Sequence, residues 1–202
     1  MRYRQKRFYE WSDKIAYSVG LMASDGCLQS DGRHLDLTSI DITQLNNFSK
    51  ALDRDFVIGR KKNKSLMDAY RIQFSDVGYY DFLLSIGLTP AKSKTMPALE
   101  VPDQYYPHFL RGLFDGDGTV YGYWDSRWVN SLMYYCCYTS ASRPFLDWLC
   151  IMNTKLAGTS KGSVLINTGA YSLTLKTPKP IGNRAVPGYS GRRSRSRFLG
   201  TK

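Results

Sequence analysis

Two segments of this chain repeat one pattern of small, apolar and acidic residues, nearly half the sequence apart. The first, residues 17–28, reads YSVGLMASDGCL, and the second, residues 109–120, reads FLRGLFDGDGTV. Aligning the two segments pairs Gly20 with Gly112, Leu21 with Leu113, Asp25 with Asp117, and Gly26 with Gly118. Asp-Gly steps are common in ordinary turns, so a true repeat must also extend to the residues that follow each copy.

The residues after the two copies predict the same series of elements. A hairpin turning at Asp31-Gly32 follows the first copy, and two aromatic-rich strands around a longer loop follow the second. Apolar residues at helical spacing then predict one helix in each half, over 40–53 and 142–157. Two further strands follow in each half, at 55–62 and 67–75 and at 162–168 and 170–177. We therefore expect an α+β chain of two pseudosymmetric αββαββ halves, with an extra helix over 77–87 in the first.

A proline-rich link, residues 88–107, joins the two halves. Pro107 is placed to begin the helix of the second copy, because proline is tolerated in the first turn. We expect an N-terminal half over 1–96, a C-terminal half over 97–178 and a basic tail over 179–202. The tail combines prolines and glycines with Arg-Arg-Ser-Arg-Ser-Arg, a composition typical of disorder, where the repeat would instead predict an apolar helix.

Small residues lie on one face of each repeated helix. Gly20 and Ser24 are four residues apart, as are Gly112 and Gly116, so each pair shares a helix face. Two helices with such faces can approach each other backbone to backbone. If they pair in parallel about a pseudo-twofold axis, their C-terminal ends converge.

The converging helix ends would each carry one aspartate, Asp25 and Asp117. A helix C-terminus already has partial negative charge and free carbonyl groups, so two such ends with two carboxylates repel each other unless a cation joins them. Because all the ligands are oxygen atoms, Mg²⁺ or a similar hard divalent ion is the expected cation. Gly26 and Gly118 are expected to end the two helices in the left-handed conformation. The alternative is that the two aspartates only cap their helices.

The charge of the chain indicates its partner. Lys and Arg number 28 against 17 Asp and Glu, which gives a net charge of +11. A strongly basic globular protein most often binds nucleic acid; the alternative is a basic protein that is merely soluble. No stretch is apolar enough for a signal peptide or a membrane span, and the four cysteines form no Cys-x-x-Cys pair. We therefore expect reduced thiols, no membrane partner and an intracellular location, in the cytoplasm or nucleoid or in an organelle matrix.

The nonapeptides SVGLMASDG (residues 18–26) and LRGLFDGDG (residues 110–118) resemble the motif of the LAGLIDADG homing endonucleases. The resemblance covers roughly residues 10 to 176, and the stretch LTPAKSKT is also typical of this family. It implies a monomer whose motif helices form the central interface, while two antiparallel sheets form a saddle on double-stranded DNA with a long specific target site.

The resemblance also implies the residues of an active site. The last aspartate of each motif, Asp25 or Asp117, would bind the catalytic metal, Mg²⁺ or Mn²⁺. The backbone carbonyls just before them, those of Ser24 and Gly116, would be further ligands.

Other positions around the motif follow from the same resemblance. Lys92 and Lys94 occupy the place of a basic residue near the scissile phosphate; the alternative is an ordinary solvated loop lysine. Ser39 and Ser140 occupy strand ends where family members hold an active-site water. The motif's earlier acidic position, Asp115, has no acidic counterpart in the first copy, so we expect a structural role for it.

Side chains on the polar face of the strands are expected to contact DNA, because strand alternation separates this face from the core. The complete expected set is Gln29, His34, Lys61, Lys62, Arg71, Gln73, Tyr121, Tyr123, Tyr135, Ser172, Thr174 and Lys176. Among them, Lys61 and Lys62 form a basic loop with Lys64 that would bind phosphates. For any one residue, the alternative is an ordinary solvated strand face.

The resemblance and the presence of both Asp25 and Asp117 favour a site-specific endonuclease of a mobile intron, which hydrolyses both DNA strands with a divalent metal. One alternative is an RNA maturase that helps its host intron RNA to fold. Another is a non-cleaving nucleic-acid-binding protein of the same fold. Both alternatives would need the basic surface but not both carboxylates.

Overall fold

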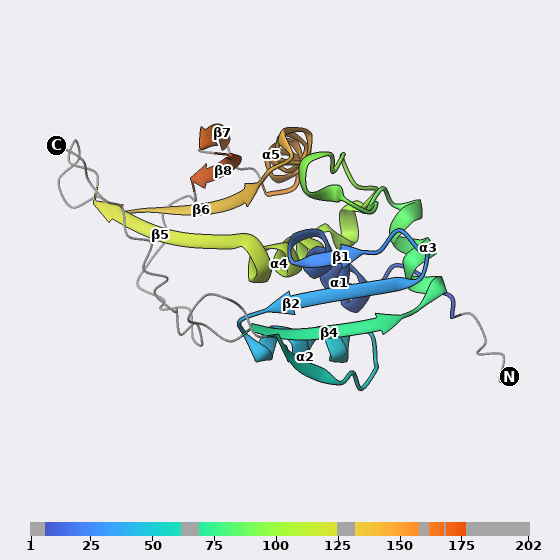
Figure 1. The fold of residues 1–202 in the computed structure, drawn as a ribbon. Helices are drawn as coiled ribbons and strands as arrows, with labels where there is room; N and C mark the ends of the chain where they lie inside the picture. The colour runs from blue at the N-terminus through green and yellow to red at the C-terminus, as the bar shows by residue number, and fades with distance from the viewer. Residues whose placement is uncertain (1–6, 62–68, 125–131, 158–161, 168, 177–202) are drawn as a thin grey trace, which may run out of the picture.

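Each half of the chain folds into the same six elements in the same order (Figure 1). The computed structural model describes residues 7–61, 69–124, 132–157, 162–167 and 169–176. The first half contains α1 (Asp13–Ser24), β1 (Gly26–Leu28), β2 (His34–Ser39), α2 (Ile42–Ala51), β3 (Ile58–Lys61), β4 (Ala69–Ser75) and the extra helix α3 (Val77–Ser85). The second contains α4 (Tyr106–Asp117), β5 (Gly118–Trp124), β6 (Leu132–Ser140), α5 (Arg143–Ala157), β7 (Gly162–Asn167) and β8 (Ala170–Lys176). The expected α+β fold of two αββαββ halves is confirmed.

Helices begin where the sequence supplies caps for their free N–H groups. The Ser12 hydroxyl accepts a hydrogen bond of 3.3 Å from the N–H of Ile15 at the start of α1. Asp41 and Asp76 cap α2 and α3 in the same way. Pro107 lies in the first turn of α4, as expected, because its missing N–H needs no partner there.

The two sheets have the same strand order, β1-β2-β4-β3 and β5-β6-β8-β7, and all neighbouring strands are antiparallel. The hairpin between β1 and β2 turns at Gly32, whose φ of 78° lies in the left-handed region. Along β4, Ile72 and Phe74 are buried, whereas Gln73 and Ser75 are exposed. The first sheet therefore has an apolar face toward the core and a polar face away from it.

Helices α1 and α4 lie side by side at the centre of the molecule, with strands of the two sheets on either side (Figure 1). Their buried side chains include Leu21, Met22, Phe109 and Leu113, which belong to one hydrophobic core that also contains residues of both sheets. Helix α2 packs against β2 and β4, and α5 packs against β6, β7 and β8. One core therefore joins the two halves.

Glycine allows the close contact between α1 and α4. A Cβ atom at Gly20 would overlap the carbonyl oxygen of Phe109 and would lie 2.5 Å from the backbone nitrogen of Leu113. A Cβ atom at Gly112 would likewise overlap the carbonyl oxygen of Tyr17. The two helix backbones are therefore in direct contact, as the small-residue faces predicted.

Gly26 and Gly118 do not have the left-handed conformation expected at the helix ends, so that prediction is wrong. Gly118 is extended, with φ −82° and ψ 146°, and Gly26 is not among the glycines with positive φ. Both residues begin strands directly after the helices. Glycine is needed there for space, because a Cβ atom would meet the backbone of Met22 at Gly26 and the ring of Phe114 at Gly118.

The link between the halves is packed into the core. Met96, Leu99 and Val101 are buried, and the hydroxyl of Ser142, just before α5, donates a hydrogen bond of 2.6 Å to the carbonyl of Met96. Ala91 has a φ of 55° where the chain turns into the short 3₁₀ helix η1 (Lys92–Lys94). A second 3₁₀ helix, η2 (Asp103–Tyr105), leads into α4. The prolines of this segment predicted a link between the halves. The structure adds that its apolar residues are part of the hydrophobic core.

Several expectations fall outside the described residues. Lys62 and Lys64 belong to 62–68, and the tail belongs to 177–202, so phosphate contacts by this loop and disorder of the tail stay predictions. The boundaries of the two halves, at 1–96 and 97–178, also stay predictions. Within the described ranges, no helix is both long enough and apolar enough to span a membrane.

Gly20→Ala should strongly destabilise the protein. The added methyl group would force α1 and α4 apart where their backbones touch, and overpacking of this kind costs about 1–3 kcal/mol or more. We expect the free energy of unfolding, measured by urea denaturation, to fall by at least about 2 kcal/mol. Gly59→Ala is the matched control, because the nearest atom to its new Cβ would be the carbonyl oxygen of Arg71 at 3.8 Å. Equal stability of Gly20→Ala and the wild type would contradict the backbone contact.

Candidate active site and nucleic-acid interface

The C-terminal ends of the two central helices bring Asp25 and Asp117 together. Asp25 directly follows α1, and its N–H donates a hydrogen bond of 3.0 Å to the carbonyl of Leu21. Asp117 is the last residue of α4. Gly116 lies so close to α1 that a Cβ atom there would be 3.3 Å from Oδ2 of Asp25 and would overlap the side chain of Ser24. Both carboxylates therefore lie at one end of the helix seam, the contact between α1 and α4.

Lys92, from the link, places its ammonium group against the end of α1. Its Nζ donates hydrogen bonds to the carbonyl oxygens of Ala23, at 2.7 Å, and Ser24, at 3.2 Å. The residue is only 7% exposed. Burial lowers the pKa of Lys92, and the nearby carboxylates of Asp117 and Asp25 oppose that shift. The ammonium group thus partly balances the charge of both aspartates.

The two lysines expected near the scissile phosphate differ in position. Lys94 is exposed at the end of η1, where it fits the alternative of a solvated loop lysine. Lys92 is buried at the helix seam and does not fit that alternative.

Sequence reasoning did not identify Gln44 as a site residue. Its Nε2 donates a hydrogen bond of 3.1 Å to Oδ2 of Asp25, and its Oε1 accepts one from the hydroxyl of Ser39. Gln44 is buried on the face of α2 that it shares with Phe48, four residues later. An amide on an otherwise apolar helix face was the available signal, because a buried polar group needs a partner.

The second carboxylate has a different environment. Phe145 is buried at the position equivalent to Gln44, counted from the strand-end serine of each half. That serine, Ser140, accepts a hydrogen bond of 3.1 Å from the N–H of Ser142, just as Ser39 accepts one of 3.0 Å from the N–H of Asp41, but Phe145 has no amide to link it to the aspartate. Among the described side chains, none donates a hydrogen bond to Asp117. The pseudosymmetry of the backbone therefore does not extend to the partners of the two aspartates.

Both carboxyl groups are harder to ionise than a free aspartate. Burial raises the pKa of Asp25, while the hydrogen bond from Gln44 and the charge of Lys92 oppose the shift. Burial, and then the charge of Asp25, raise the pKa of Asp117 to about 6, against the effect of Lys92. Neighbouring atoms crowd the carboxyl group of Asp117, but the residue as a whole is exposed to solvent, so an ion can reach it.

The oxygen atoms at the seam fit a hard divalent cation. The carboxylates of Asp25 and Asp117 and the carbonyls of Ser24 and Gly116 are the type of ligand that suits Mg²⁺ and Mn²⁺. In the described part of the chain, no group of three or more His, Cys, Asp or Glu residues could hold a metal ion. A cation here would therefore complete its coordination with backbone, water or phosphate oxygens. Lys92 competes for one ligand, because it already contacts the Ser24 carbonyl.

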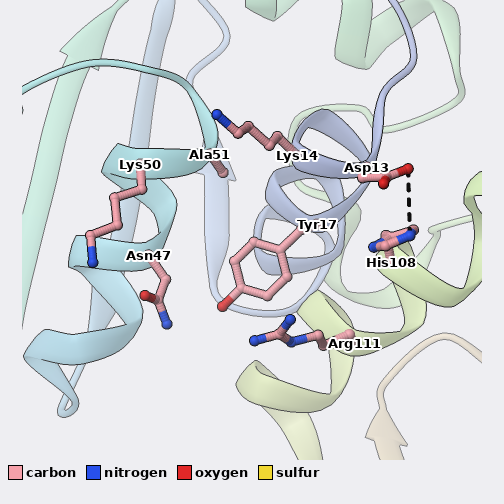
Figure 2. A pocket seen from close by; sticks show the side chains of 8 residues that line it. All are labelled: Asp13, Lys14, Tyr17, Asn47, Lys50, Ala51, His108 and Arg111. Atoms are coloured by element: carbon pink, nitrogen blue, oxygen red, sulfur yellow. Dashed lines mark ion pairs between the residues drawn. The ribbon is translucent and has the colours of Figure 1, made fainter.

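A separate hollow lies among α1, α2 and α4, toward the N-terminal parts of α1 and α4 (Figure 2). The hydroxyl of Tyr17 donates a hydrogen bond of 2.8 Å to Asp115, and the guanidinium of Arg111 lies 5.4 Å from the centre of the Tyr17 ring. Nε2 of His108, on α4, also lies 3.4 Å from Oδ1 of Asp13, on α1. These contacts hold α4 against α1, and Asp115 contributes to them, which agrees with the structural role expected for it.

On the polar face of the first sheet, four residues expected to contact DNA line one hollow of about 430 Å³. They are Gln29, His34, Arg71 and Gln73. Arg71 and Gln73 belong to β4, where they lie in register with Thr38 and Asp36 of β2. Lys61 is exposed at the end of β3. The sheet therefore gathers most of the first-half set on one surface.

The outer face of the second sheet, which corresponds to the polar face of the first, carries tyrosine rings. The rings of Tyr121 on β5 and Tyr135 on β6 stack with centroids 5.3 Å apart and an interplanar angle of 18°. Tyr123 also belongs to β5, and Lys176 is the last residue of β8. Register with β6 brings Ser172 and Thr174 of β8 to the same face as Tyr135. The described side chains of the second-half set therefore also share one face of their sheet.

No protein-family model matches the sequence, and no curated protein matches it significantly. Solved structures are similar to it. The homing endonuclease I-WcaI, bound to its DNA recognition sequence, has a TM-score of 0.56 and 10% identity, over 82% of this chain and 76% of that one. The N-terminal LAGLIDADG domain of DUF199/WhiA has a TM-score of 0.53 and 15% identity, over 83% of this chain and 77% of that one.

Full-length DUF199/WhiA from Thermatoga maritima has a TM-score of 0.55 and 14% identity, over 85% of this chain. The match covers 54% of that protein, so this chain spans about half of its length. At these identities the similarities establish the fold alone. The chain has the LAGLIDADG fold, and the resemblance carried by the two nonapeptides is confirmed at that level.

Asp117→Asn should stabilise the metal-free protein at neutral pH. In the folded state the pKa of Asp117 is raised from 3.8 to about 6, so ionisation of this group opposes folding above pH 6. Asparagine carries no charge and removes that penalty. We expect the free energy of unfolding at pH 8, with a chelator present, to rise by less than about 1 kcal/mol, because solvent reaches the side chain.

The gain should diminish as the pH falls through 6 and should vanish near pH 4, where the wild-type carboxyl group is protonated in the folded protein. Thermal melts of the wild type and Asp117→Asn across this range measure the difference. A variant less stable than the wild type at pH 8 would mean that the attraction of Lys92 outweighs burial and the repulsion of Asp25.

Proposed function

We propose that this chain is an endonuclease that uses a divalent metal to hydrolyse both strands of double-stranded DNA at a long specific site. The meeting of Asp25 and Asp117 at the end of a close-packed helix pair, between two sheets with polar outer faces, carries the proposal. One carboxylate from each pseudosymmetric half suits a duplex, whose two strands are themselves related by twofold symmetry.

DNA as the partner is supported by charge, surface and fold. The net charge of +11 favours association with phosphates. The polar faces carry amide, guanidinium, hydroxyl and aromatic groups that suit base edges and sugars. I-WcaI, which has the same fold, binds its DNA recognition sequence. Because one chain supplies both halves of the seam, we propose that the monomer is the active form.

The chain's own residues prepare the seam for the chemistry. Mg²⁺ or Mn²⁺ would be held by Asp25, Asp117 and the backbone carbonyls of Ser24 and Gly116. When bound, such an ion supplies an activated water and stabilises charge on the leaving oxygen. Gln44 orients the carboxylate of Asp25 through its amide nitrogen. Lys92 offsets part of the negative charge that an approaching phosphate would meet.

The two nonapeptides also support an origin in a mobile intron, inside the cell that carries the target DNA. The insertion site of that intron would then be the target. This origin makes the DNA that flanks the gene the first substrate to test.

A second candidate is a nucleic-acid-binding protein that does not cleave, including an RNA maturase that acts on its host intron RNA. The position of Lys92 favours it, because an ammonium group at the seam can replace a metal ion as the counter-charge of two carboxylates. In that case Asp25 and Asp117 would contribute to structure alone, and the polar faces would carry the function.

Asp25→Asn and Asp117→Asn should each reduce double-strand cleavage by about 100-fold or more. Asparagine keeps the size of the side chain but removes charge that holds the metal. DNA binding should persist or tighten, because a carboxylate no longer repels the phosphates. The assay is metal-dependent cleavage of a plasmid that carries the DNA flanking the gene, with a gel shift on the same DNA.

Asp115→Asn is the matched control, because Asp115 lies on the same helix as Asp117 but is bonded to Tyr17. This variant should still cleave. If the wild type binds the DNA without cutting it in Mg²⁺ or Mn²⁺, and the variants bind equally well, the endonuclease proposal is wrong and the non-cleaving candidate is favoured.

A further inference from the structure

An acidic residue lies on the polar face of the first sheet, where the proposed DNA partner would approach. Asp36 is in β2, in register with Cys27 on β1 and Gln73 on β4, both of which are exposed. Asp36 itself is only 6% exposed. A carboxylate repels phosphates, so its presence on this surface is unfavourable for DNA binding unless another group uses its charge.

Neighbouring side chains use both oxygens of Asp36. Oδ2 accepts a hydrogen bond from Nε of Arg71 and forms an ion pair with Nη2 of the same residue. Oδ1 accepts a hydrogen bond of 3.0 Å from the hydroxyl of Thr38. Thr38 is in register with Arg71 across β2 and β4. Three residues on two strands therefore form one cluster around the Asp36 carboxylate.

Asp36 holds only one edge of the Arg71 guanidinium. This planar group carries five N–H donors, and Nε and Nη2 form one of its side edges. The end edge, with Nη1 and the second N–H of Nη2, lies outside that contact. The side chain of Arg71 is 34% exposed, and it lines the hollow that also contains Gln29, His34 and Gln73.

The two parallel donors on the end edge of the guanidinium match one base. Guanine presents two acceptors, N7 and O6, in the major groove, whereas adenine presents an acceptor beside a donor and cytosine presents a donor. A bidentate Arg–guanine contact favours the correct base by about 5- to 150-fold, the equivalent of about 1–3 kcal/mol. Because its side edge is already bonded, Arg71 loses little further freedom when the base arrives.

We propose that Asp36 and Arg71 form a guanine-reading pair, in which Asp36 positions the guanidinium and Arg71 contacts N7 and O6 of one guanine. This inference rests on the proposed DNA-binding function and deepens it. Among the described residues of the second half, Cys137 and Ser172 occupy the register positions equivalent to Asp36 and Arg71, so the pair is not repeated there. The guanine read by this pair therefore lies in the half of the target that the first sheet contacts.

Asp36 acts as a positioning residue, and its removal has a signature that a purely structural role would not give. Without the carboxylate, Arg71 can turn to a DNA phosphate, a contact that carries no sequence information. Loss of a negative charge from the polar face also reduces repulsion of the phosphates. Asp36→Asn should therefore keep or raise affinity for DNA in general while it lowers the preference for guanine.

The test is selection from a randomised double-stranded DNA library by the full chain, with a chelator present to prevent cleavage. Affinities for single-base variants of the selected site are then measured by fluorescence anisotropy. The wild type should prefer guanine at one position by at least about fivefold. Arg71→Ala should remove this preference, and so should Arg71→Lys, which keeps the charge but lacks the planar fork. Asp36→Asn should weaken it.

Asp31→Asn is the matched control. Asp31 is another acidic residue of the same hollow, but it pairs with His34 and Arg33 and does not contact Arg71. Its removal changes the charge of the surface by the same amount and should leave the guanine preference unchanged. A loss of preference in Asp31→Asn equal to that in Asp36→Asn would show a general charge effect and would overturn the positioning role.

The remaining outcomes separate this inference from the function on which it rests. If the wild type selects no sequence, site-specific DNA binding itself is wrong. If it selects a site in which no guanine responds to Arg71→Ala, specific binding stands and the guanine-reading pair is overturned. If the Arg71 variants lose the preference and a folded Asp36→Asn retains it in full, the role of Asp36 is overturned. Melting temperatures measured in parallel establish folding, and the Arg71 variants change a partly exposed side chain.

Discussion

The direct contact of two helix backbones at Gly20 and Gly112 fixes the position of everything around it. Because no side chain separates α1 from α4 there, the two helices end side by side and their terminal carboxylates interact. The same contact sets one sheet on each side of the helix pair (Figure 1). The candidate site is therefore a consequence of helix packing. Its geometry depends on two residues, Gly20 and Gly112, that take no part in its chemistry.

The packing brings the negative charges of Asp25 and Asp117 together, and the chain compensates these two charges in different ways. Gln44 donates a hydrogen bond to Asp25, whereas the equivalent position of the second half is occupied by the buried, apolar Phe145. Burial, and then the charge of Asp25, raise the pKa of Asp117 to about 6, and no such hydrogen bond from a described side chain opposes the shift. A cation that bound beside Asp117 would remove part of the repulsion that folding creates, so ion binding and fold stability are coupled. Lys92 supplies a smaller, permanent form of the same compensation from within the chain.

The sequence predicted the two halves, the helix seam and the meeting of Asp25 and Asp117. These features follow from the repeated motif and from residue spacings within single helices and strands, which can be read directly along the chain. Contacts between distant segments were not predictable in this way. The burial of Lys92 arises from packing of the whole link, which spacing alone does not reveal. Gly26 and Gly118 were assigned to left-handed caps, since glycine favours that conformation. In the structure, crowding by the preceding helix excludes a side chain at both positions, and the backbone is not left-handed.

A symmetric backbone with asymmetric side chains suits an asymmetric DNA site. The polar face of the first sheet carries Arg71 fixed by Asp36, whereas that of the second carries the stacked rings of Tyr121 and Tyr135. A homodimer of one half would present the same surface twice and would read a palindrome, because a twofold interface repeats every contact. Two halves in one chain can diverge on their outer faces. The helix seam cannot diverge as freely, because both halves meet there without room for a side chain.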